Sequence, residues 1–405
     1  MKLTVIALTT LAVGGMFAST ALSQEKRIKI GVLEDQSGLY ADATGAGSTM
    51  ATRMAIEDSG LLEKGWVIDI VAADHQNRAD VGSNLARQWF DADGVDAIVG
   101  LGSSSVSLAV SEIAREKNKT AIVTSGGTSD LTGHACNANT VHWTYDTYAL
   151  AKSTGSAITE AGGGSWFFIA ADYAFGEALV RDTITAVEEA GGNIVGIVRH
   201  PLSAPDYSSY LLQAQASGAK VVAFANAGSD ATNSIKQAAE FGLMSSDQTM
   251  AALLMFINDV HALGLPTAQG LNLTSTFYWD LNDDTRAFTA RYAERMGFDT
   301  VPSMPQAGTY SGTLHLLKAA ELLDGDLSDG AKVAEAMKQL PKSDPLFGEG
   351  EVRIDGRATH PVYLFKAKTP EESTSSWDLY ELIGTVPGEE GFRPLDKGNC
   401  PLVGN

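Results

Sequence analysis

The chain has 405 residues, of which 44% are hydrophobic and 19% charged, and its formal net charge is -20. This composition is typical of a folded globular protein and excludes a disordered chain. The length exceeds what one hydrophobic core usually organises, which predicts two domains. Because the chain is acidic and has no run of Lys or Arg, binding to nucleic-acid phosphates is excluded, and we attribute the acidity to solubility.

The N-terminus has the three parts of an export signal. Lys2 supplies a positive charge, residues 3–18 form an apolar run, and Ala21-Leu22-Ser23 is a small-x-small cleavage site. The apolar run is short for a membrane span, so cleavage is favoured over an uncleaved anchor. We therefore assign residues 1–23 to a signal peptide and expect an exported protein that begins at Gln24.

Two cysteines, Cys136 and Cys400, are present in the whole chain. In an oxidising compartment an even pair predicts a disulfide, with two unrelated thiols as the alternative. This disulfide would close a very long loop and tie the C-terminal tail to the first domain.

Strand and helix patterns alternate through the first third of the chain. Strands are predicted at 27–33, 66–72, 96–99 and 120–124, and helices at 44–59, 79–92 and 106–117. In the second helix, for example, Val81, Leu85 and Trp89 recur on one face. This alternation predicts an α/β domain with a parallel sheet.

The same rhythm restarts after residue 145 and indicates a second α/β unit. Its helices are predicted at 149–160, 176–190, 207–216 and 230–241, and its strands at 165–170, 194–199, 220–225 and 250–256.

A third section breaks the rhythm with a β-rich run at 271–279, helices at 285–296, 309–323 and 330–340, and short strands at 351–354, 361–366 and 377–383. We expect these helices to return to the first domain and these strands to join the second. The chain would then cross between domains near 141–147, 272–279 and 345–358.

Two neighbouring strand ends break into serine, threonine and glycine. The first is Gly100-Leu-Gly-Ser-Ser-Ser105, directly before a helix, and the second is Ser125-Gly-Gly-Thr128. Ligands of open parallel sheets bind outside the carboxyl ends of the strands, and a helix N-terminus there offers unpaired N–H groups. Hydroxyls and bare N–H groups together predict a cradle for a small anion, most simply a carboxylate.

These tracts lack the sequence motifs of a catalytic nucleophile or a dinucleotide-binding loop. They contain no Gly-x-Ser-x-Gly nucleophile elbow, and Gly100-Leu-Gly102 lacks the third glycine of a dinucleotide loop. The seven histidines show no metal-ligand spacing. We therefore predict a binding protein that is no enzyme and has no cofactor or metal.

Six segments, taken in order behind the export signal, carry a family resemblance: 28–40 (Ile28-Lys-Ile-Gly-Val-Leu-Glu-Asp-Gln-Ser-Gly-Leu-Tyr40), 51–58, 96–105, 125–132, 172–176 (Asp172-Tyr-Ala-Phe-Gly176) and 224–230. The chain resembles periplasmic solute-binding proteins of ABC importers, in the type I group that includes the branched-chain amino-acid binders. The resemblance covers essentially the whole mature chain. It implies a monomeric periplasmic protein that captures a small solute and delivers it to a permease in the inner membrane.

The resemblance also implies an α/β fold of two lobes, each a mainly parallel sheet flanked by helices, with three crossings between them and a cleft that closes by hinge motion. The N-terminal lobe would comprise 24–144 and 275–346, and the C-terminal lobe 145–274 and 347–390. The tail, 391–405, would be tied back near the hinge.

Site residues follow from the same resemblance. Ser103, Ser104 and Ser105 would form one half of the carboxylate cradle, and Ser125, Gly126, Gly127 and Thr128 the other half. Tyr173 and Phe175 would cap the ligand from the second lobe, and Asn226 would line the far wall. Apart from the resemblance, Tyr148 follows the first crossing directly, which places it at the cleft hinge. Tyr40, Phe256, Tyr278 and Trp279 are candidates for apolar walls, with core packing as the alternative.

The chain departs from the amino-acid binders where they hold the ligand ammonium. The corresponding segment is Met255-Phe-Ile-Asn-Asp259, so either Asp259 serves or the acid is missing, and Ala225-Asn226 replaces a far-wall tyrosine. Two ligand classes therefore stay open: an amino acid, or an aromatic or aliphatic carboxylate. The alternatives to transport are a soluble sensory co-receptor and, less favoured, an exported α/β hydrolytic enzyme.

Overall fold

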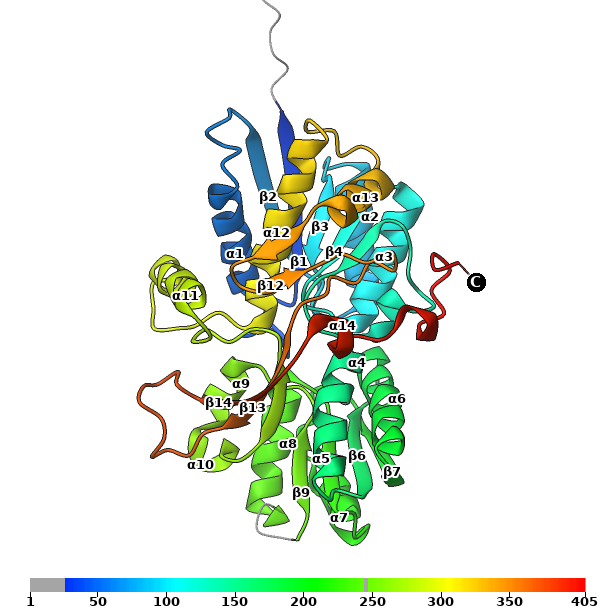
Figure 1. Ribbon diagram of the computed structural model, residues 1–405, viewed down its shortest axis with the longest axis vertical. Helices are drawn as coiled ribbons and strands as arrows, with labels where there is room; N and C mark the ends of the chain where they lie inside the picture. The colour runs from blue at the N-terminus through cyan, green and yellow to red at the C-terminus, as the bar shows by residue number, and fades with distance from the viewer. Residues whose placement is uncertain (1–25, 244–246, 405) are drawn as a thin grey trace, which may run out of the picture.

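A computed structural model describes residues 26–243 and 247–404, and these form two α/β lobes, one above the other in Figure 1. The predicted signal peptide, residues 1–23, lies outside the described residues. None of the described helices is both long and apolar enough to cross a bilayer.

The upper lobe contains a five-stranded parallel sheet in the order β2-β1-β3-β4-β5. Its strands are β1 (Arg27–Glu34), β2 (Val67–Asp74), β3 (Ala97–Gly100), β4 (Thr120–Val123) and β5 (Thr140–His142), and its first helices are α1 (Gly45–Asp58), α2 (Ala79–Asp91) and α3 (Ser104–Lys117). Every residue of β3 and β4 is buried, as expected for parallel strands covered by helices on both faces.

The lower lobe contains a four-stranded parallel sheet in the order β7-β6-β8-β9 (Figure 1). Its strands are β6 (Ser165–Ala171), β7 (Asn193–His200), β8 (Val221–Ala225) and β9 (Thr249–Ala252), and its helices include α6 (Ala174–Glu189), α7 (Ser208–Ala216) and α8 (Gly228–Glu240). The helix predicted at 149–160 is divided: a π-helical turn (Ala151–Gly155) separates α4 (Thr147–Leu150) from α5 (Ser156–Glu160).

The last third of the chain contributes elements to both lobes. Helices α11 (Asp283–Met296), α12 (Met304–Leu322) and α13 (Gly330–Gln339) follow two short helices, α9 (Ile257–Leu263) and α10 (Leu265–Ala268). Helix α12 packs beside α1 in the upper lobe (Figure 1), where the Ser303 hydroxyl donates to the Ala43 carbonyl over 2.5 Å. Strands β10 (Asn272–Ser275), β13 (Val362–Ala367) and β14 (Tyr380–Val386) form an antiparallel sheet beside the lower lobe.

One predicted strand, at 351–354, is wrong. The chain makes a single bridge there, between Val352 and Ala358, because a turn closed by the Gly356 N–H and the Arg353 carbonyl reverses its direction. The strands of this region are instead β11 (Lys342–Asp344) and β12 (Gly348–Gly350), which pair antiparallel.

The chain crosses between the lobes at 143–146, 276–282 and 351–361. Arg357, on the third crossing, is fully buried against the first: its guanidinium donates to the Thr144 carbonyl over 2.7 Å and pairs with Asp146 at 3.4 Å. The same guanidinium lies 4.4 Å from the ring centre of Phe392 in the tail. Two crossings and the tail are therefore fixed to one another by one side chain.

The predicted disulfide between Cys136 and Cys400 is present, with 5.5 Å between the two Cα atoms. Arg393 also holds the tail, because its guanidinium donates to the Ser129 carbonyl over 2.5 Å. The tail contains α14 (Gly388–Gly391) and a short 3-10 helix (Leu395–Lys397), and it runs beside a second 3-10 helix (Ser129–Thr132) of the upper lobe.

Candidate ligand-binding site

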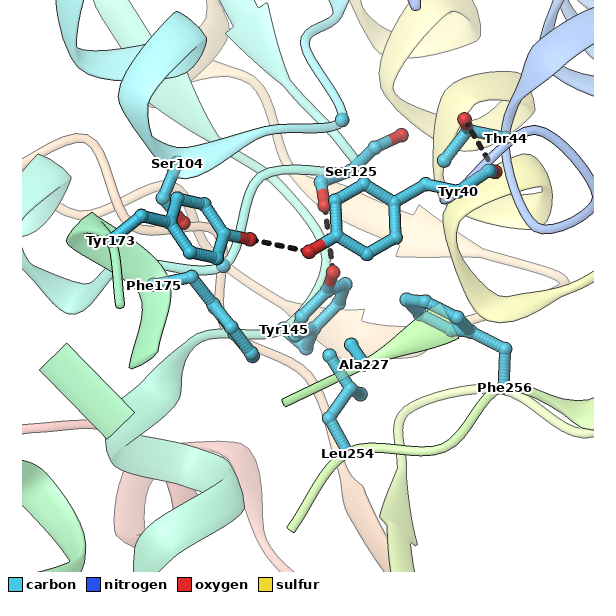
Figure 2. Close-up of a pocket in the computed structure, with 12 residues that line it drawn as sticks. Tyr40, Thr44, Ser104, Ser125, Tyr145, Tyr173, Phe175, Ala227, Leu254 and Phe256 are labelled. Carbon is cyan, nitrogen blue, oxygen red and sulfur yellow. Dashed lines mark hydrogen bonds between the residues drawn. The ribbon is translucent and has the colours of Figure 1, made fainter. Parts of the chain in front are cut away.

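A small cavity lies between the lobes, at the carboxyl ends of both parallel sheets (Figure 2). Its volume in this conformation is only about 10 Å³, far below the range of about 300–1,000 Å³ that is typical of small-ligand pockets, so the lobes and side chains leave little open space between them. None of its lining residues carries a charge; they are Tyr40, Thr44, Gly102, Ser104, Ser125, Gly127, Tyr145, Tyr173, Phe175, Ala227, Leu254 and Phe256.

The first side of the cavity is the turn from β3 into α3. Leu101 has a left-handed φ of 67°, and the Ser107 hydroxyl holds this turn by bonding to the carbonyls of Leu101 at 2.7 Å and Ser103 at 2.8 Å. No side chain caps the N-terminus of α3. The N–H groups of its first turn are therefore available to a ligand.

The second side is the tract that follows β4. Three of its carbonyls accept hydrogen bonds from outside the tract: Ser125 from the Tyr145 hydroxyl, Gly126 from His142 Nε2 and Gly127 from the Thr147 N–H, each at 2.7 Å. The Ser104 hydroxyl oxygen accepts the Thr128 N–H over 3.1 Å, which joins the two sides.

Glycine is required in this tract because the neighbours approach closely. A β-carbon at Gly126 would lie 1.9 Å from the Ser107 hydroxyl oxygen, and one at Gly127 would lie 2.9 Å from the rings of Phe175 and Tyr145.

Two more helices begin at the cavity from the lower lobe. Tyr173 and Ala227 are the residues that precede α6 and α8, and neither helix has a side-chain cap. Three helix N-termini without side-chain caps thus meet at one cavity, and their positive dipole ends favour a bound anion. At α8 one N–H is already used, because Ser229 donates to the Leu39 carbonyl over 3.2 Å.

Aromatic rings form the remaining walls. Tyr145 and Phe256 meet edge-on with ring centres 6.0 Å apart, and Tyr173 and Phe175 lie 6.2 Å apart. The hydroxyls of Tyr40 and Tyr173 point toward each other across the cavity (Figure 2). Large apolar rings with hydroxyls at their ends suit a flat ligand that carries a few polar atoms.

Two buried acids lie near the cavity without lining it. Glu34, at the end of β1, accepts the Ser125 hydroxyl over 2.6 Å, and burial raises the pKa of its carboxyl to about 8. Asp259 accepts the Phe256 N–H over 2.9 Å, and burial raises its pKa to about 7. Both acids are therefore held toward their neutral form.

Six of the predicted site residues line the cavity: Tyr40, Ser104, Ser125, Gly127, Tyr173 and Phe175. Four more are their neighbours in the two tracts: Ser103, Ser105, Gly126 and Thr128. Their roles in binding stay predictions.

Three predicted site residues lie elsewhere. Tyr148 lines a separate surface depression with Arg181 and Arg393, and Asn226 donates to His200 Nε2 over 3.1 Å inside the lower lobe. Asp259 is the third. Of the candidate apolar walls, Tyr278 stacks on Tyr380 and Trp279 donates to the Trp377 carbonyl, so both belong to the core, whereas Phe256 lines the cavity.

The sequence did not single out several residues in or directly behind the site: Glu34, Thr44, Tyr145 and Leu254. Tyr145 follows β5, a strand of three residues inside a segment that was interpreted as a crossing. Within residues 26–243 and 247–404, no group of His, Cys, Asp and Glu is arranged to hold a metal ion.

Comparison with known proteins places the chain in a family. Residues 27–373 match the model of the periplasmic binding proteins. The chain belongs to the periplasmic binding protein family. This confirms the predicted fold of two helix-flanked parallel sheets, and it confirms that the protein is a binding protein and not an enzyme.

Relatives of known structure cover nearly the whole chain. A periplasmic binding protein from Burkholderia mallei is 45% identical, with a TM-score of 0.90 over 93% of this chain and 99% of its own. A branched-chain amino acid ABC transporter periplasmic ligand-binding protein from Burkholderia xenovorans is 36% identical, with a TM-score of 0.81 over the same shares of the two chains. A Leu/Ile/Val-binding protein homologue from Brucella melitensis is 26% identical over 91% of this chain and 94% of its own. The chain is thus similar over nearly its whole length to a periplasmic ligand-binding protein of an ABC transporter.

Proposed function

We propose that this binding protein captures an aromatic monocarboxylate of the benzoate class between its lobes and delivers it to the permease of an ABC importer. One observation carries the choice of ligand: the cavity has aromatic walls and an N–H and hydroxyl cradle, and no charged residue lines it.

The carboxylate would lie against the start of α3 and the tract after β4. There the Ser104 and Ser125 hydroxyls and the uncapped N–H groups of α3 face the cavity. Hydrogen bonds from such groups to a charged acceptor contribute about 1.5–3 kcal/mol each. No cation is required, because three helix N-termini already supply partial positive charge.

The ring of the ligand would lie among Tyr145, Phe175 and Phe256. Side chains from both lobes contact the same small space, so a ligand there binds the closed form in preference to the open one. That preference is what allows a ligand to close the lobes.

An α-amino acid is the second candidate, because the relative from Burkholderia xenovorans is named as a branched-chain amino acid transporter component. Its ammonium group would need a buried counter-charge, and an unpaired buried cation is costly. No acidic residue lines the cavity, and Asp259 is already bonded to the Phe256 N–H. This electrostatic difference favours a ligand without an amine.

Isothermal titration calorimetry of unfolded and refolded protein, which removes any co-purified ligand, tests the proposal. Benzoate and 4-hydroxybenzoate are titrated beside leucine, isoleucine and valine. We expect a dissociation constant in the micromolar range or below for an aromatic acid, about -8 kcal/mol or stronger. Binding of leucine without binding of either benzoate would overturn the aromatic assignment and leave the transport role in place.

The proposal includes a periplasmic monomer that docks on its permease with ligand bound. Sedimentation velocity at increasing protein concentration checks the monomer, and reconstituted permease in vesicles checks delivery of the ligand.

A further inference from the structure

Glu34 is a buried carboxyl directly behind the carboxylate cradle. It is the last residue of β1, it has no exposed surface, and its Oε1 accepts the Ser125 hydroxyl over 2.6 Å. Its other oxygen, Oε2, is buried and makes no hydrogen bond of good geometry, although the Ser48 hydroxyl and the Gly102 N–H lie close enough to oppose part of the rise in the pKa of Glu34. Ser125 itself lines the cavity, so one hydroxyl separates this acid from the space that a ligand would fill.

The surroundings of Glu34 offer it no positive charge. Ser48 from α1, Gly100 and Gly102 from the end of β3, and Ser125 from the end of β4 are all uncharged. The titratable groups around it are Asp35, next in the chain, Tyr145 from the segment after β5, and Asp74 and His75 at the end of the paired strand β2. Burial lowers the pKa of His75 to about 4, so this imidazole is neutral at pH 7.

The protonation of Glu34 decides which way the Ser125 hydroxyl points. An ionised carboxylate can only accept, so the Ser125 hydroxyl donates its hydrogen bond to Glu34 and presents only lone pairs to the cavity. A protonated carboxyl can donate to the Ser125 oxygen instead, and this frees the serine proton to donate toward the cavity. A ligand carboxylate needs the second arrangement.

We propose that Glu34 is a specificity-determining residue that acts as a neutral carboxylic acid and orients the Ser125 hydroxyl to donate to the ligand carboxylate. The inference rests on the proposed function, because it requires a carboxylate in the cavity. It adds that the site takes an anion only while Glu34 holds its proton, although Glu34 does not line the cavity.

The protonation of Glu34 determines how affinity for a carboxylate should change with pH. In the protein without ligand, burial raises the pKa of Glu34 to about 8. A bound anion stabilises the protonated form of Glu34 further. Affinity for a carboxylate is therefore constant at neutral pH and falls above pH 8, toward a limit of about tenfold per pH unit. Binding above pH 8 takes up a proton.

Benzoate is a suitable probe because its single titratable group stays ionised across this pH range. Its dissociation constant is measured by calorimetry from pH 6 to 9.5, and proton uptake is measured at high pH in two buffers of different ionisation enthalpy. Wild-type protein should lose affinity above pH 8 and take up protons. Glu34→Gln should do neither, because the amide does not titrate.

Two further variants make the test specific. Asp259→Asn removes another buried acid with a raised pKa and should keep the wild-type profile above pH 8. Ser125→Ala should flatten the profile, since the hydroxyl that responds to Glu34 is gone; an unchanged profile in Ser125→Ala overturns the proposal. Circular dichroism confirms that each variant is folded.

The same titrations distinguish a failure of the Glu34 hypothesis from a failure of the proposed ligand class. If wild-type protein binds benzoate with no loss of affinity up to pH 9.5, the role of Glu34 is wrong and the proposed ligand class stands. If wild-type protein does not bind benzoate or 4-hydroxybenzoate at pH 6, the proposed ligand class is wrong, and the role of Glu34 falls with it.

Discussion

The hydroxyl of Tyr40 in the upper lobe lies 2.5 Å from the hydroxyl of Tyr173 in the lower lobe (Figure 2). Close by, the Ser229 N–H at the start of α8 donates to the Leu39 carbonyl over 3.2 Å. These bonds run directly from lobe to lobe, so the described conformation is the closed one. Closure therefore depends on these polar contacts between the lobes as well as on the packing of apolar side chains from both lobes.

Replacing Tyr173 by phenylalanine should shift the lobes toward the open form. The loss of a hydrogen bond worth about 0.5–1.5 kcal/mol should raise the dissociation constant by about 2- to 12-fold. Small-angle scattering of the ligand-free variant should show a larger radius of gyration than wild type. Tyr363→Phe, on β13 away from the cavity, is the matched control and should change neither quantity. Equal behaviour of the two variants would show that the Tyr40–Tyr173 contact does not govern closure.

Ser104→Ala should weaken ligand binding by about 1–3 kcal/mol, because it removes a cradle hydroxyl and leaves the buried Thr128 N–H without its acceptor. Calorimetry with the best-binding carboxylate measures the effect. Ser111→Ala is a control in the same helix: Ser111 is buried and bonded to Thr140 at 2.6 Å, far from the cavity. It should lower the melting temperature without changing affinity. An affinity of Ser104→Ala within twofold of wild type contradicts the cradle.

Asp259→Asn separates the two ligand classes. The asparagine oxygen can still accept the Phe256 N–H, so the start of α9 should be preserved. If the ligand is a carboxylate without an amine, its affinity should change by less than about threefold, under 1 kcal/mol. If the protein instead binds an amino acid through Asp259, the same change removes the counter-charge of the ammonium and affinity should fall by more than tenfold. A competition titration with leucine and benzoate distinguishes these outcomes.

The sequence predicts the sheets well because buried parallel strands are short apolar runs bounded by turn residues. The strand predicted at 96–99 is β3, Ala97–Gly100. Thr140–His142 was missed because three residues carry too little pattern. Helix α12 begins at Met304, five residues before the predicted start, although Ser303 and Gln306 form a capping box there that the sequence contains.

From the sequence, only those parts of the site that lie on neighbouring strands of one sheet can be predicted. Ser104 and Ser125 follow neighbouring parallel strands, so their proximity follows from topology alone. Glu34 is 91 residues from Ser125 in the chain, and Leu254 lines the cavity from the lower lobe. Such contacts depend on how separate elements pack, which local pattern does not encode.

Removing the disulfide should loosen the tail and spare the site. Replacing Cys136 and Cys400 together by alanine should lower the free energy of unfolding by about 2–4 kcal/mol. Limited trypsin digestion should then cut after Lys397, which the bridge otherwise holds near the upper lobe. Neither cysteine lines the cavity, so ligand affinity should stay within twofold of wild type. A tail that resists trypsin as well as wild type would mean that the contacts of Arg393 hold it without the bridge.

Stability between pH 7 and 8 should depend on Glu34. Its pKa is about 8 in the folded protein and 4.5 ordinarily, so over that interval the folded state keeps a proton that the unfolded state has released. The free energy of unfolding should therefore fall as pH rises, by up to about 1.4 kcal/mol per pH unit, and level off above pH 8. Asp259 has the same sign, but its contribution ends near pH 7, where its folded pKa lies.

Buried His75 has the opposite sign: its pKa falls from 6.5 to about 4 on folding, so the stability that it affects is lost only as pH falls below 6.5. Buried Lys342, whose pKa burial lowers to about 8, titrates in the same window with the opposite sign to Glu34. The contribution of Glu34 is therefore read from the difference between wild type and Glu34→Gln. Urea unfolding at half-unit steps of pH should give a falling curve for wild type and a flatter one for Glu34→Gln, whose amide does not titrate. Parallel curves for the two proteins would mean that Glu34 is ionised in the folded state, and that its buried position is not what sets its proton affinity.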